Sequence, residues 1–538
     1  MKYQCTFCDI VADNRNDPKF TSCRNSNHEI MDFYEEGELD DMVSSSIVAK
    51  PTKGSDKPKK QTFTKVKGFI GNDLYVESVL VDSKARFLAK RLDSGDITVK
   101  ENIEINDMKF KPLEANECGY APYAFASAEV NELTNDILSK EKILDQVKEQ
   151  IDRFIVAKDL DKHLILGDIF LTYCQEWIST LHFPFFVGET ESGKSSVLHL
   201  GKYLNYRCLY GEDLPNADIY NFLGSDEEGC GTIAEDEAQD IVEYREKIRT
   251  YKNSYSKNSF KARMLMLQNK KQQVFYKTFC PKWFAGEKIP QDKGFLERLA
   301  IIYMIEGIPT SNIKRATEDE QKILNQIRNK LLVWKLQNIG ESFSKVDSGL
   351  KGRDQELWED FLSVTNGTKY FEKCKNVVSY YVNQRQEAIR NSLEAKLFNL
   401  LLEKLGKDFQ LNFIDYWIFI TQDNPQFDGS FKNNSERTFY PDNYPEKITH
   451  HSLAKIIDYK FQGKKLQTKF RDSNNVQHQS TLYQFKKDVL RVLVKKYGVG
   501  LPLDSLLYVG EQGELDEPGG NQVDQGNQLE KMSQGESK

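Results

Sequence analysis

The chain has 538 residues, enough for three or four domains of roughly 150 residues each. Its net charge of -7 does not by itself indicate a DNA-binding protein. A mean hydropathy of -0.60 and the lack of any apolar run near the roughly 18 residues that span a bilayer argue against a membrane protein or a membrane partner.

Nine cysteines are present, and most of them are isolated in the sequence. This spacing excludes the dense disulfide framework of a small secreted domain and predicts a soluble, cytoplasmic protein in a reducing compartment. The isolated cysteines are Cys118, Cys174, Cys208, Cys230, Cys280 and Cys374.

The first thirty residues contain a pattern of metal ligands. Cys5 and Cys8 are separated by two residues, and Cys23 and His28 follow after a loop, which matches the two ligand pairs of a tetrahedral Zn²⁺ site. The pattern predicts a structural zinc finger over residues 1–39, with a set of unligated thiols as the alternative. Fingers of this kind bind nucleic acid or protein, and the sequence does not distinguish the two.

Residues 40–61 are rich in Ser, Lys and Pro and are predicted to form a linker. From Phe63 to about Pro112, short alternating segments with turns at residues 71–73 and 93–95 predict a small antiparallel β module, assigned to residues 62–130. Such a module either binds single strands or serves only for packing.

A helical region follows the β module. Apolar residues recur every four positions at Ile143, Val147, Ile151 and Ile155, so one stripe is expected to face a core. The helical pattern is predicted to continue through GDIFLTYCQEWISTL to Leu181. These helices lead into the domain assigned to residues 131–340.

Residues 182–200, HFPFFVGETESGKSSVLHL, indicate an apolar strand, a glycine loop and a helix. The loop matches the phosphate-binding pattern G-x4-G-K-[ST], in which backbone N–H groups surround phosphates, Lys194 reaches the β- and γ-phosphates and the Ser195 hydroxyl binds Mg²⁺. Glu189 and Glu191 would repel phosphate and are expected to face outward or toward a partner. The predicted ATP-binding residues of this loop are Gly188, Glu189, Thr190, Glu191, Ser192, Gly193, Lys194, Ser195 and Ser196.

The segment GTIAEDEAQDI, which begins at Gly231, predicts the acidic half of the same site. Asp236 would hold Mg²⁺ through water and Glu237 would act as general base, although a shift of one residue would make Glu235 the metal ligand. The residues between Lys194 and Asp236 fit a helix, the short strand YRCLY and another helix, which predicts one strand between the two motif strands. That order is typical of the additional-strand, catalytic-glutamate class of α/β P-loop NTPases, which is RecA/AAA+-like.

The segment VFYKTFCPKWFAGEKIPQDKGFLERLAIIYMIEG predicts a strand, a polar tip, a short helix and another strand. Arg298 stands just before the last strand, and Arg263 lies earlier in NSFKARMLML. Either arginine could stabilise charge on the γ-phosphate, in its own subunit or in a neighbour. The alternative for each is a surface arginine paired with an acid.

Roughly residues 115–340 resemble the helicase-like ATPase modules of replication and primase-associated proteins from archaeal and phage mobile elements. The resemblance is carried by four segments in succession: LTYCQEWISTLHFPFFVGETESGKSS, GTIAEDEAQDI, SFKARM and FCPKWFAGEKIPQDKGFLERLAIIYM. The resemblance implies a homo-oligomeric ring, such as a hexamer, that acts on DNA, with Arg298 reaching a neighbour's nucleotide. The polar Asn or Thr usual at the tip of WFAGEK is replaced by Glu287 and Lys288. The positions that correspond to the family pattern are Pro281, Lys282, Ala285, Gly286, Asp292, Leu296 and Arg298.

Residues 314–405 are mostly helical by period, and residues 341–405 are assigned to a helical connector. From Lys447 to Tyr497, twelve Lys and Arg residues stand against three Asp, a local balance of +9. The pattern of helix, hairpin near Asn474 and Asn475, and helix predicts a DNA-binding winged helix over residues 406–500, with a protein-interaction module as the alternative.

Residues 501–538 form an acidic tail that is predicted to be disordered.

These features predict an ATP-dependent DNA-processing enzyme with ATP, Mg²⁺ and Zn²⁺ as cofactors. A replicative helicase of a mobile genetic element, acting on single-stranded or forked DNA, is the leading interpretation. The alternative is a DNA-binding regulator or defence protein that uses ATP as an assembly switch without unwinding. A third interpretation is a protein-remodelling ATPase.

Overall fold

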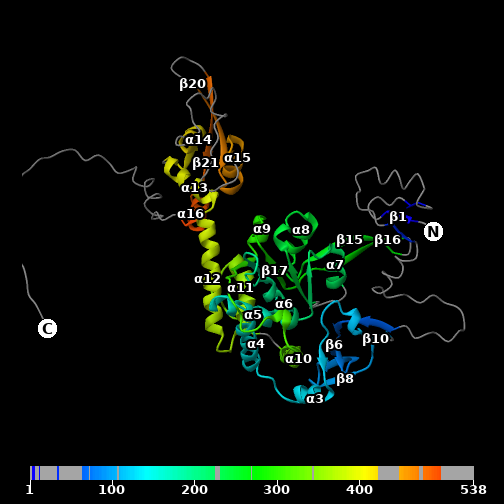
Figure 1. Cartoon of the computed structure of the whole chain (residues 1–538). Helices are drawn as coiled ribbons and strands as arrows, with labels where there is room; N and C mark the ends of the chain where they lie inside the picture. Colours follow the sequence, from blue (N-terminus) through cyan, green and yellow to red (C-terminus); the bar gives the residue numbers. More distant parts are fainter. Residues whose placement is uncertain are drawn as a thin grey trace, which may run out of the picture. The chain divides into compact units, whose positions relative to one another are not determined.

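The computed structural model describes residues 63–498, with gaps at 72, 106–107, 225–230, 268–269, 342–343, 407, 422–447 and 472–476. It also describes three N-terminal strands, β1 (Tyr3–Cys5), β2 (Val11–Ala12) and β3 (Phe33–Glu35), which form an antiparallel sheet in the order β2-β1-β3 (Figure 1). The predicted linker and the acidic tail lie outside the described residues. The chain divides into two compact units between Val382 and Asn383, and each is described separately.

The first unit is built on a parallel sheet in the strand order β13-β14-β17-β12-β18. Every residue of β12, β14 and β17 is buried, as expected for the central strands of a parallel sheet. This arrangement confirms a mixed α/β core. The strand bounds are β12 (Phe183–Val187), β13 (Cys208–Glu212), β14 (Thr232–Asp236), β17 (Lys282–Gly286) and β18 (Leu299–Tyr303).

One strand separates β12 from β14, as predicted, but it is not the strand that the sequence indicated. The YRCLY segment forms β13 at the edge of the sheet, and β17, which follows both motif strands in the chain, takes the position between them. The expectation was wrong because the helical connection after β12 carries the chain past two strand positions, so order along the chain does not give order in the sheet.

Helices cover both faces of this sheet (Figure 1). On one face lies α6 (Lys194–Leu204), whose Gly201 allows close approach, because a Cβ there would lie 3.1 Å from the Trp283 ring. On the other face lie α8 (Arg245–Asn253) and α9 (Lys293–Leu296), which pack on Phe284. Trp283 and Phe284 are adjacent in β17, so their side chains point to opposite faces.

The helical region before the sheet consists of α3 (Ser127–Asn135), α4 (Lys140–Phe154) and α5 (Asp159–Thr172). The predicted stripe of α4 is buried, which confirms its orientation. The prediction that helix continues to Leu181 was wrong, because α5 ends at Thr172. The Thr172 hydroxyl donates to the carbonyl of Ile169 and the Gln175 amide donates to that of Thr172, so side chains compete for the backbone acceptors of a further turn.

The predicted helical character of residues 314–405 is confirmed by α10 (Glu318–Asn338), α11 (Arg353–Thr365) and α12 (Phe371–Arg390), which crosses into the second unit. The first unit also contains α7 (Asn216–Gly224), between β13 and β14. Between β14 and β17 the chain also forms a hairpin, β15 (Phe260–Leu267) and β16 (Lys270–Lys277), which extends from the sheet (Figure 1).

The β module before α3 contains two sheets, in the orders β4-β10-β9 and β11-β6-β7-β8, with β5 paired to β6. Most pairs are antiparallel, as predicted, but β4–β10 and β6–β11 are parallel because residues distant in the chain close each sheet. The bounds are β4 (Phe63–Val66), β5 (Gly68–Ile70), β6 (Leu74–Val81), β7 (Lys84–Arg91), β8 (Ile97–Lys100), β9 (Ile103–Ile105), β10 (Met108–Pro112) and β11 (Ala124–Phe125).

A buried ion pair joins the β module to the parallel sheet. Arg207, just before β13, donates from Nε to Glu77 Oε1 over 2.7 Å and from NH2 to Oε2 over 2.8 Å, and both side chains are almost fully buried. The Arg207 backbone adopts a left-handed φ of 42°, and its carbonyl accepts from the first N–H of β14. One residue therefore contacts both the β module and the strand that carries the acidic motif.

The second unit begins near the end of α12 and contains a three-stranded antiparallel sheet in the order β19-β21-β20. The predicted hairpin is present as β20 and β21, and its connection at residues 472–476 lies outside the described residues. Two further elements, β19 and α14, were not predicted from the sequence. The elements are α13 (Leu393–Lys404), β19 (Gln410–Asn412), α14 (Phe413–Thr421), α15 (His450–Lys455), the π-helical turn η5 (Ile456–Lys460), β20 (Lys464–Arg471), β21 (Gln477–Gln484) and α16 (Lys487–Tyr497).

Across the described ranges, no helix combines the length and apolar character needed to cross a bilayer. Five of the isolated cysteines are buried free thiols: Cys118, Cys174, Cys208, Cys280 and Cys374. Cys230 lies outside the described residues.

Candidate functional site

The glycine loop connects the carboxyl end of β12 to the first turn of α6. Gly193 caps this helix with a left-handed φ of 90°, and a Cβ added to Gly188 would lie 2.5 Å from the Ser192 hydroxyl. Both positions therefore require glycine. The resulting turn leaves the first backbone N–H groups of α6 directed at the loop, which is the geometry of an anion site at a helix N-terminus.

Two buried polar side chains line the loop. The Lys194 side chain donates from Nζ to the carbonyl of Glu189 over 3.1 Å, and the residue is only 7% exposed. None of the described residues supplies a partner for the buried Ser192 hydroxyl. Glu189 and Glu191 are exposed, as expected, so their charges point away from the loop interior. A buried cation, an unpaired hydroxyl and a helix N-terminus fit a bound triphosphate.

The structure separates the two acids that the sequence analysis left open as metal ligands. Glu235 points toward α8, where it forms a buried ion pair with Lys247 and accepts a hydrogen bond of 2.8 Å from the Tyr251 hydroxyl. Burial raises the pKa of Glu235, and Lys247 opposes this rise. Side chains alternate along a strand, so Asp236 faces the opposite side, toward α6 and the glycine loop.

The charge of Asp236 contributes to the pKa shifts of two residues on the α6 side of the sheet. The pKa of Tyr210 rises to about 12, mainly through burial and then through Asp236. Burial lowers the pKa of His199, while Asp236 acts in the opposite direction. His199 lies one helical turn after Ser195 and its Nδ1 lies 2.8 Å from the Ser195 carbonyl. Neither residue was predicted from the sequence, although the i, i+4 spacing from Ser195 was a usable signal for His199.

Glu237 follows β14 at the same edge of the sheet. Its backbone is left-handed, with φ 54°, and its exposed carboxylate accepts from Gln239 Nε2 over 2.8 Å. Glu287, at the tip of the neighbouring strand β17, accepts from the Thr190 hydroxyl of the glycine loop over 3.1 Å. The loop, the acidic motif and the tip of β17 therefore meet at one edge.

Arg298 lies at the amino ends of the parallel strands, whereas the glycine loop of the same chain lies at their carboxyl ends. It precedes β18, and its carbonyl accepts from the Phe183 N–H at the start of β12. A strand of five residues spans roughly 16 Å. The guanidinium lies 4.6 Å from the centre of the Tyr255 ring, and its pKa is lowered by burial and then by Arg353.

Arg263 lies on the β15–β16 hairpin, with its guanidinium 4.9 Å from the centre of the Tyr220 ring of α7. The structure thus brings the glycine loop, Asp236 and Glu237 together and places neither arginine beside them.

The predicted zinc ligands fall mostly outside the described residues. Cys5 ends strand β1, whereas Cys8, Cys23 and His28 are not described. Within the part of the chain that the structure describes, no group of three or more His, Cys, Asp or Glu residues is arranged to hold a metal ion.

The second unit presents exposed basic side chains on several elements. Tyr459 on the turn η5 is 80% exposed, although its neighbours Ile457 and Phe461 are fully buried in the core of the unit. The π-helical turn therefore holds this aromatic ring in solvent, and the exposed Lys455 and Lys460 lie close to it in the chain. Between residues 447 and 497 the described exposed basic side chains are Lys455, Lys460, Lys464, Lys465, Lys486, Arg491, Lys495 and Lys496.

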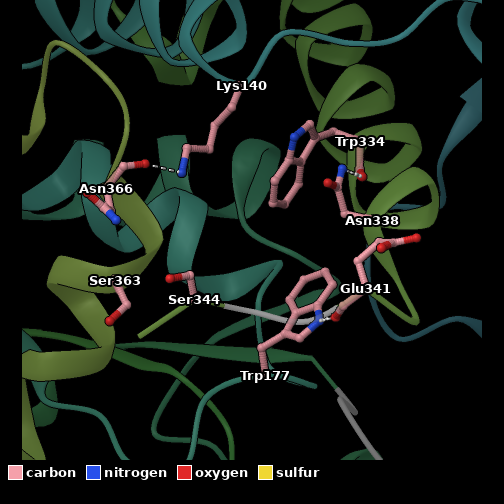
Figure 2. A pocket seen from close by; sticks show the side chains of 8 residues that line it. All are labelled: Lys140, Trp177, Trp334, Asn338, Glu341, Ser344, Ser363 and Asn366. Carbon is pink, nitrogen blue, oxygen red and sulfur yellow. Dashed lines mark hydrogen bonds between the residues drawn. The ribbon is translucent and has the colours of Figure 1, made fainter. Parts of the chain in front are cut away.

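A cavity of about 180 Å³ is lined by Lys140, Trp177, Trp334 and residues near the carboxyl ends of α10 and α11 (Figure 2). The rings of Trp177 and Trp334 stand 6.1 Å apart at 63°, and Lys140 donates to the carbonyls of Val364 and Asn366. The side chains of Lys140, Trp177 and Asn338 donate to backbone carbonyls, and the lining comes from other elements than β12, β14 and β17. The cavity is therefore separate from the candidate nucleotide site.

No protein-family model matches the chain, and no curated protein matches it. Among solved structures, the A form apo structure of the NrS-1 C-terminal region is similar with a TM-score of 0.32 and 14% identity, covering 76% of this chain and 97% of that chain. A full-length MCM homologue from Methanopyrus kandleri is similar with a TM-score of 0.29 and 11% identity, covering 58% of this chain and 74% of that chain. Both TM-scores are low, so the functional assignment rests on the residues of the site.

Proposed function

We propose that this chain is an ATP-hydrolysing enzyme that acts on DNA. The observation that carries the proposal is the meeting of the glycine loop and the acidic motif at the carboxyl edge of one parallel sheet. Ligands of open α/β sheets bind at this edge. A buried lysine and a helix N-terminus would bind phosphates there, and two carboxylates would serve metal binding and proton transfer.

Each residue has a distinct role in this proposal. Lys194 would leave the Glu189 carbonyl and contact the β- and γ-phosphates, while Ser195 and Asp236 would hold Mg²⁺, the first directly and the second through water. The ion would neutralise charge on the phosphate oxygens when bound with ATP. Glu237 would accept the proton of the attacking water. Glu235 is assigned a structural role because Lys247 and Tyr251 already engage it.

A homo-oligomer is part of the proposal. Arg298 lies at the amino ends of the strands, away from the glycine loop of its own chain, so its guanidinium would reach phosphates only in a neighbouring copy. Head-to-tail contacts between copies generate a ring when the rotation closes. We propose such a ring, with six copies as the form that the family resemblance implies.

DNA is the proposed macromolecular partner. From α13 to β21 the second unit has the order helix, strand, helix, helix, strand, strand, and α16 follows; this order supports the winged-helix interpretation. Exposed lysines would contact phosphates, and Tyr459 would stack on a base. On the β15–β16 hairpin, the exposed rings of Phe260 and Phe275 lie 5.4 Å apart and offer a second aromatic surface.

The leading form of this function is a replicative helicase of a mobile element, and the alternative is an ATP-dependent assembly switch. The experiment compares DNA-stimulated ATP hydrolysis and fork unwinding by the intact protein, Lys194→Ala and the control Lys202→Ala. Lys202 is an exposed lysine on the same helix. A helicase hydrolyses ATP faster with single-stranded DNA and unwinds forks, and only Lys194→Ala abolishes both. Slow turnover without unwinding supports the switch, and hydrolysis retained in Lys194→Ala contradicts the proposal.

A zinc finger at Cys5, Cys8, Cys23 and His28 remains part of the proposal. The spacing of these four residues, in two ligand pairs, is what supports it. Metal analysis of the purified protein should give one Zn²⁺ per chain and less in Cys5→Ser. An equal zinc content in both proteins contradicts the assignment.

A further inference from the structure

Gln239 links two strands at the catalytic edge of the sheet. Its Nε2 donates to Glu237 Oε2 over 2.8 Å, and its Oε1 accepts from the backbone N–H of Glu287 over 3.3 Å. The amide therefore uses its donor end on the acidic motif after β14 and its acceptor end on the tip of β17. Reversing the amide would place two acceptors together at one end and two donors at the other, so the network determines its orientation.

The position of Gln239 is closely packed against β17. A Cβ on Gly286 would lie 2.7 Å from Gln239 Oε1 and 3.0 Å from the Gln239 backbone nitrogen. Glycine at position 286 thus permits the approach of Gln239, and the approach allows the hydrogen bond to Glu287. The Glu287 carboxylate in turn accepts from Thr190 of the glycine loop. A continuous set of contacts connects the glycine loop to Glu237.

The Glu237 carboxylate needs a hydrogen bond from another side chain to hold its orientation. Glu237 is exposed, and its backbone lies in the left-handed region, where a glutamate is rare. An exposed glutamate samples several rotamers, whereas a general base must be held within hydrogen-bond reach of the water that it deprotonates. The Gln239 amide supplies such a contact, because it donates a hydrogen bond to the Glu237 carboxylate.

We infer that Gln239 is a positioning residue that holds the Glu237 carboxylate for proton transfer and ties it to the tip of β17. The inference rests on the proposed function and goes beyond it, because it assigns a role to a residue that contacts neither nucleotide nor metal in that proposal. Gln239 takes no proton and forms no bond with substrate. Its effect on the rate passes entirely through Glu237.

The test measures kcat and KM for ATP in the full-length protein and in Gln239→Met, Glu237→Gln and the double variant. Methionine keeps the length of the side chain but has neither an amide donor nor a carbonyl acceptor. We expect Gln239→Met to lower kcat about 10-fold or more, with nucleotide affinity within about 2-fold of the starting protein, since a hydrogen bond to a charged group is lost. Gln291→Met is the matched control, because Gln291 is exposed and donates only locally, to the Ile289 carbonyl.

The double variant separates positioning from general structural damage. If Gln239 acts through Glu237, adding Gln239→Met to Glu237→Gln lowers the rate no further, whereas structural damage lowers it by the same factor in both backgrounds. Independent losses, or an unchanged kcat in Gln239→Met, overturn the inference. The proposed function still stands in those cases if Lys194→Ala abolishes hydrolysis, and both fall if Lys194→Ala hydrolyses ATP normally.

Discussion

The first unit and the second unit use charged residues in opposite ways. In the first unit, Glu77, Glu235 and Lys194 are buried and each has a defined partner. In the second unit, many lysines and one tyrosine, Tyr459, are exposed to solvent. Removing the partner of a buried charge lowers the free energy of unfolding strongly. Removing one exposed lysine takes away only one of many phosphate contacts and lowers the affinity for nucleic acid slightly. Substitutions should therefore have large, specific effects in the first unit and small, graded effects in the second.

The largest effect is expected from Glu77→Gln. The substitution removes the charged partner of the buried Arg207, which typically destabilises a protein by about 3–5 kcal/mol. Thermal unfolding of the two proteins measures the change. The control is Glu101→Gln in the same β module, because Glu101 is 73% exposed beside Arg86 and an exposed pair contributes about 0–1 kcal/mol. Equal melting temperatures for Glu77→Gln and the unsubstituted protein would contradict the burial argument.

The next effect distinguishes Asp236 from its neighbour Glu235. We expect Asp236→Asn to weaken Mg²⁺-dependent ATP hydrolysis about 10- to 100-fold, because a group that holds a metal ion through water contributes on that scale. Its melting temperature should change little. Glu235→Gln should instead lower the melting temperature, because it leaves Lys247 without its buried carboxylate.

Titration of hydrolysis with Mg²⁺, together with thermal unfolding, measures both variants. A Glu235→Gln protein of normal stability with weakened Mg²⁺ dependence would reverse the assignment of the two acids.

A smaller effect is expected from Tyr459→Ala. Base stacking on an aromatic side chain contributes about 1–3 kcal/mol per base, so affinity for single-stranded DNA should fall accordingly, while the salt dependence of binding stays the same. Tyr459→Phe keeps the ring and should retain most of the affinity. Fluorescence anisotropy at several salt concentrations measures both quantities. Equal losses in the two variants would argue against stacking.

The smallest effect is expected from single lysines such as Lys455. Lys455→Ala should reduce the slope of log affinity against log salt by about 1, because one phosphate contact is lost. Hydrolysis without DNA should be unchanged. A drop in affinity that does not depend on salt would show that Lys455 does not contact phosphate.

The sequence predicted the local parts of the site well. The strand, glycine loop and helix around Lys194 are contiguous in the chain, and the structure contains them as expected. Strand order was not predictable in the same way, because the position of β17 depends on pairings between segments nearly 100 residues apart. The sequence could not choose between Glu235 and Asp236, since that choice depends on which face α8 covers.

Gln239 and Arg207 carried no motif in the sequence. Gln239 matters because Gly286 lets it approach a strand that is distant in the chain, and Arg207 matters because Glu77 lies 130 residues earlier. Both contacts are products of tertiary packing. Short motifs identify groups that bind a ligand, but they do not identify the groups that hold those residues in place.

The Arg207–Glu77 pair also determines how this protein can be divided for experiments. A fragment that begins at residue 131 would keep Arg207 but lose its carboxylate, and the carbonyl of Phe222 would lose its contact with Lys67. Such a fragment would expose apolar surface and leave the buried Arg207 charge without its partner just before β13, so it should be recovered mainly in the insoluble fraction. An expression boundary near Phe63 keeps these contacts and is the better choice for isolating the catalytic part.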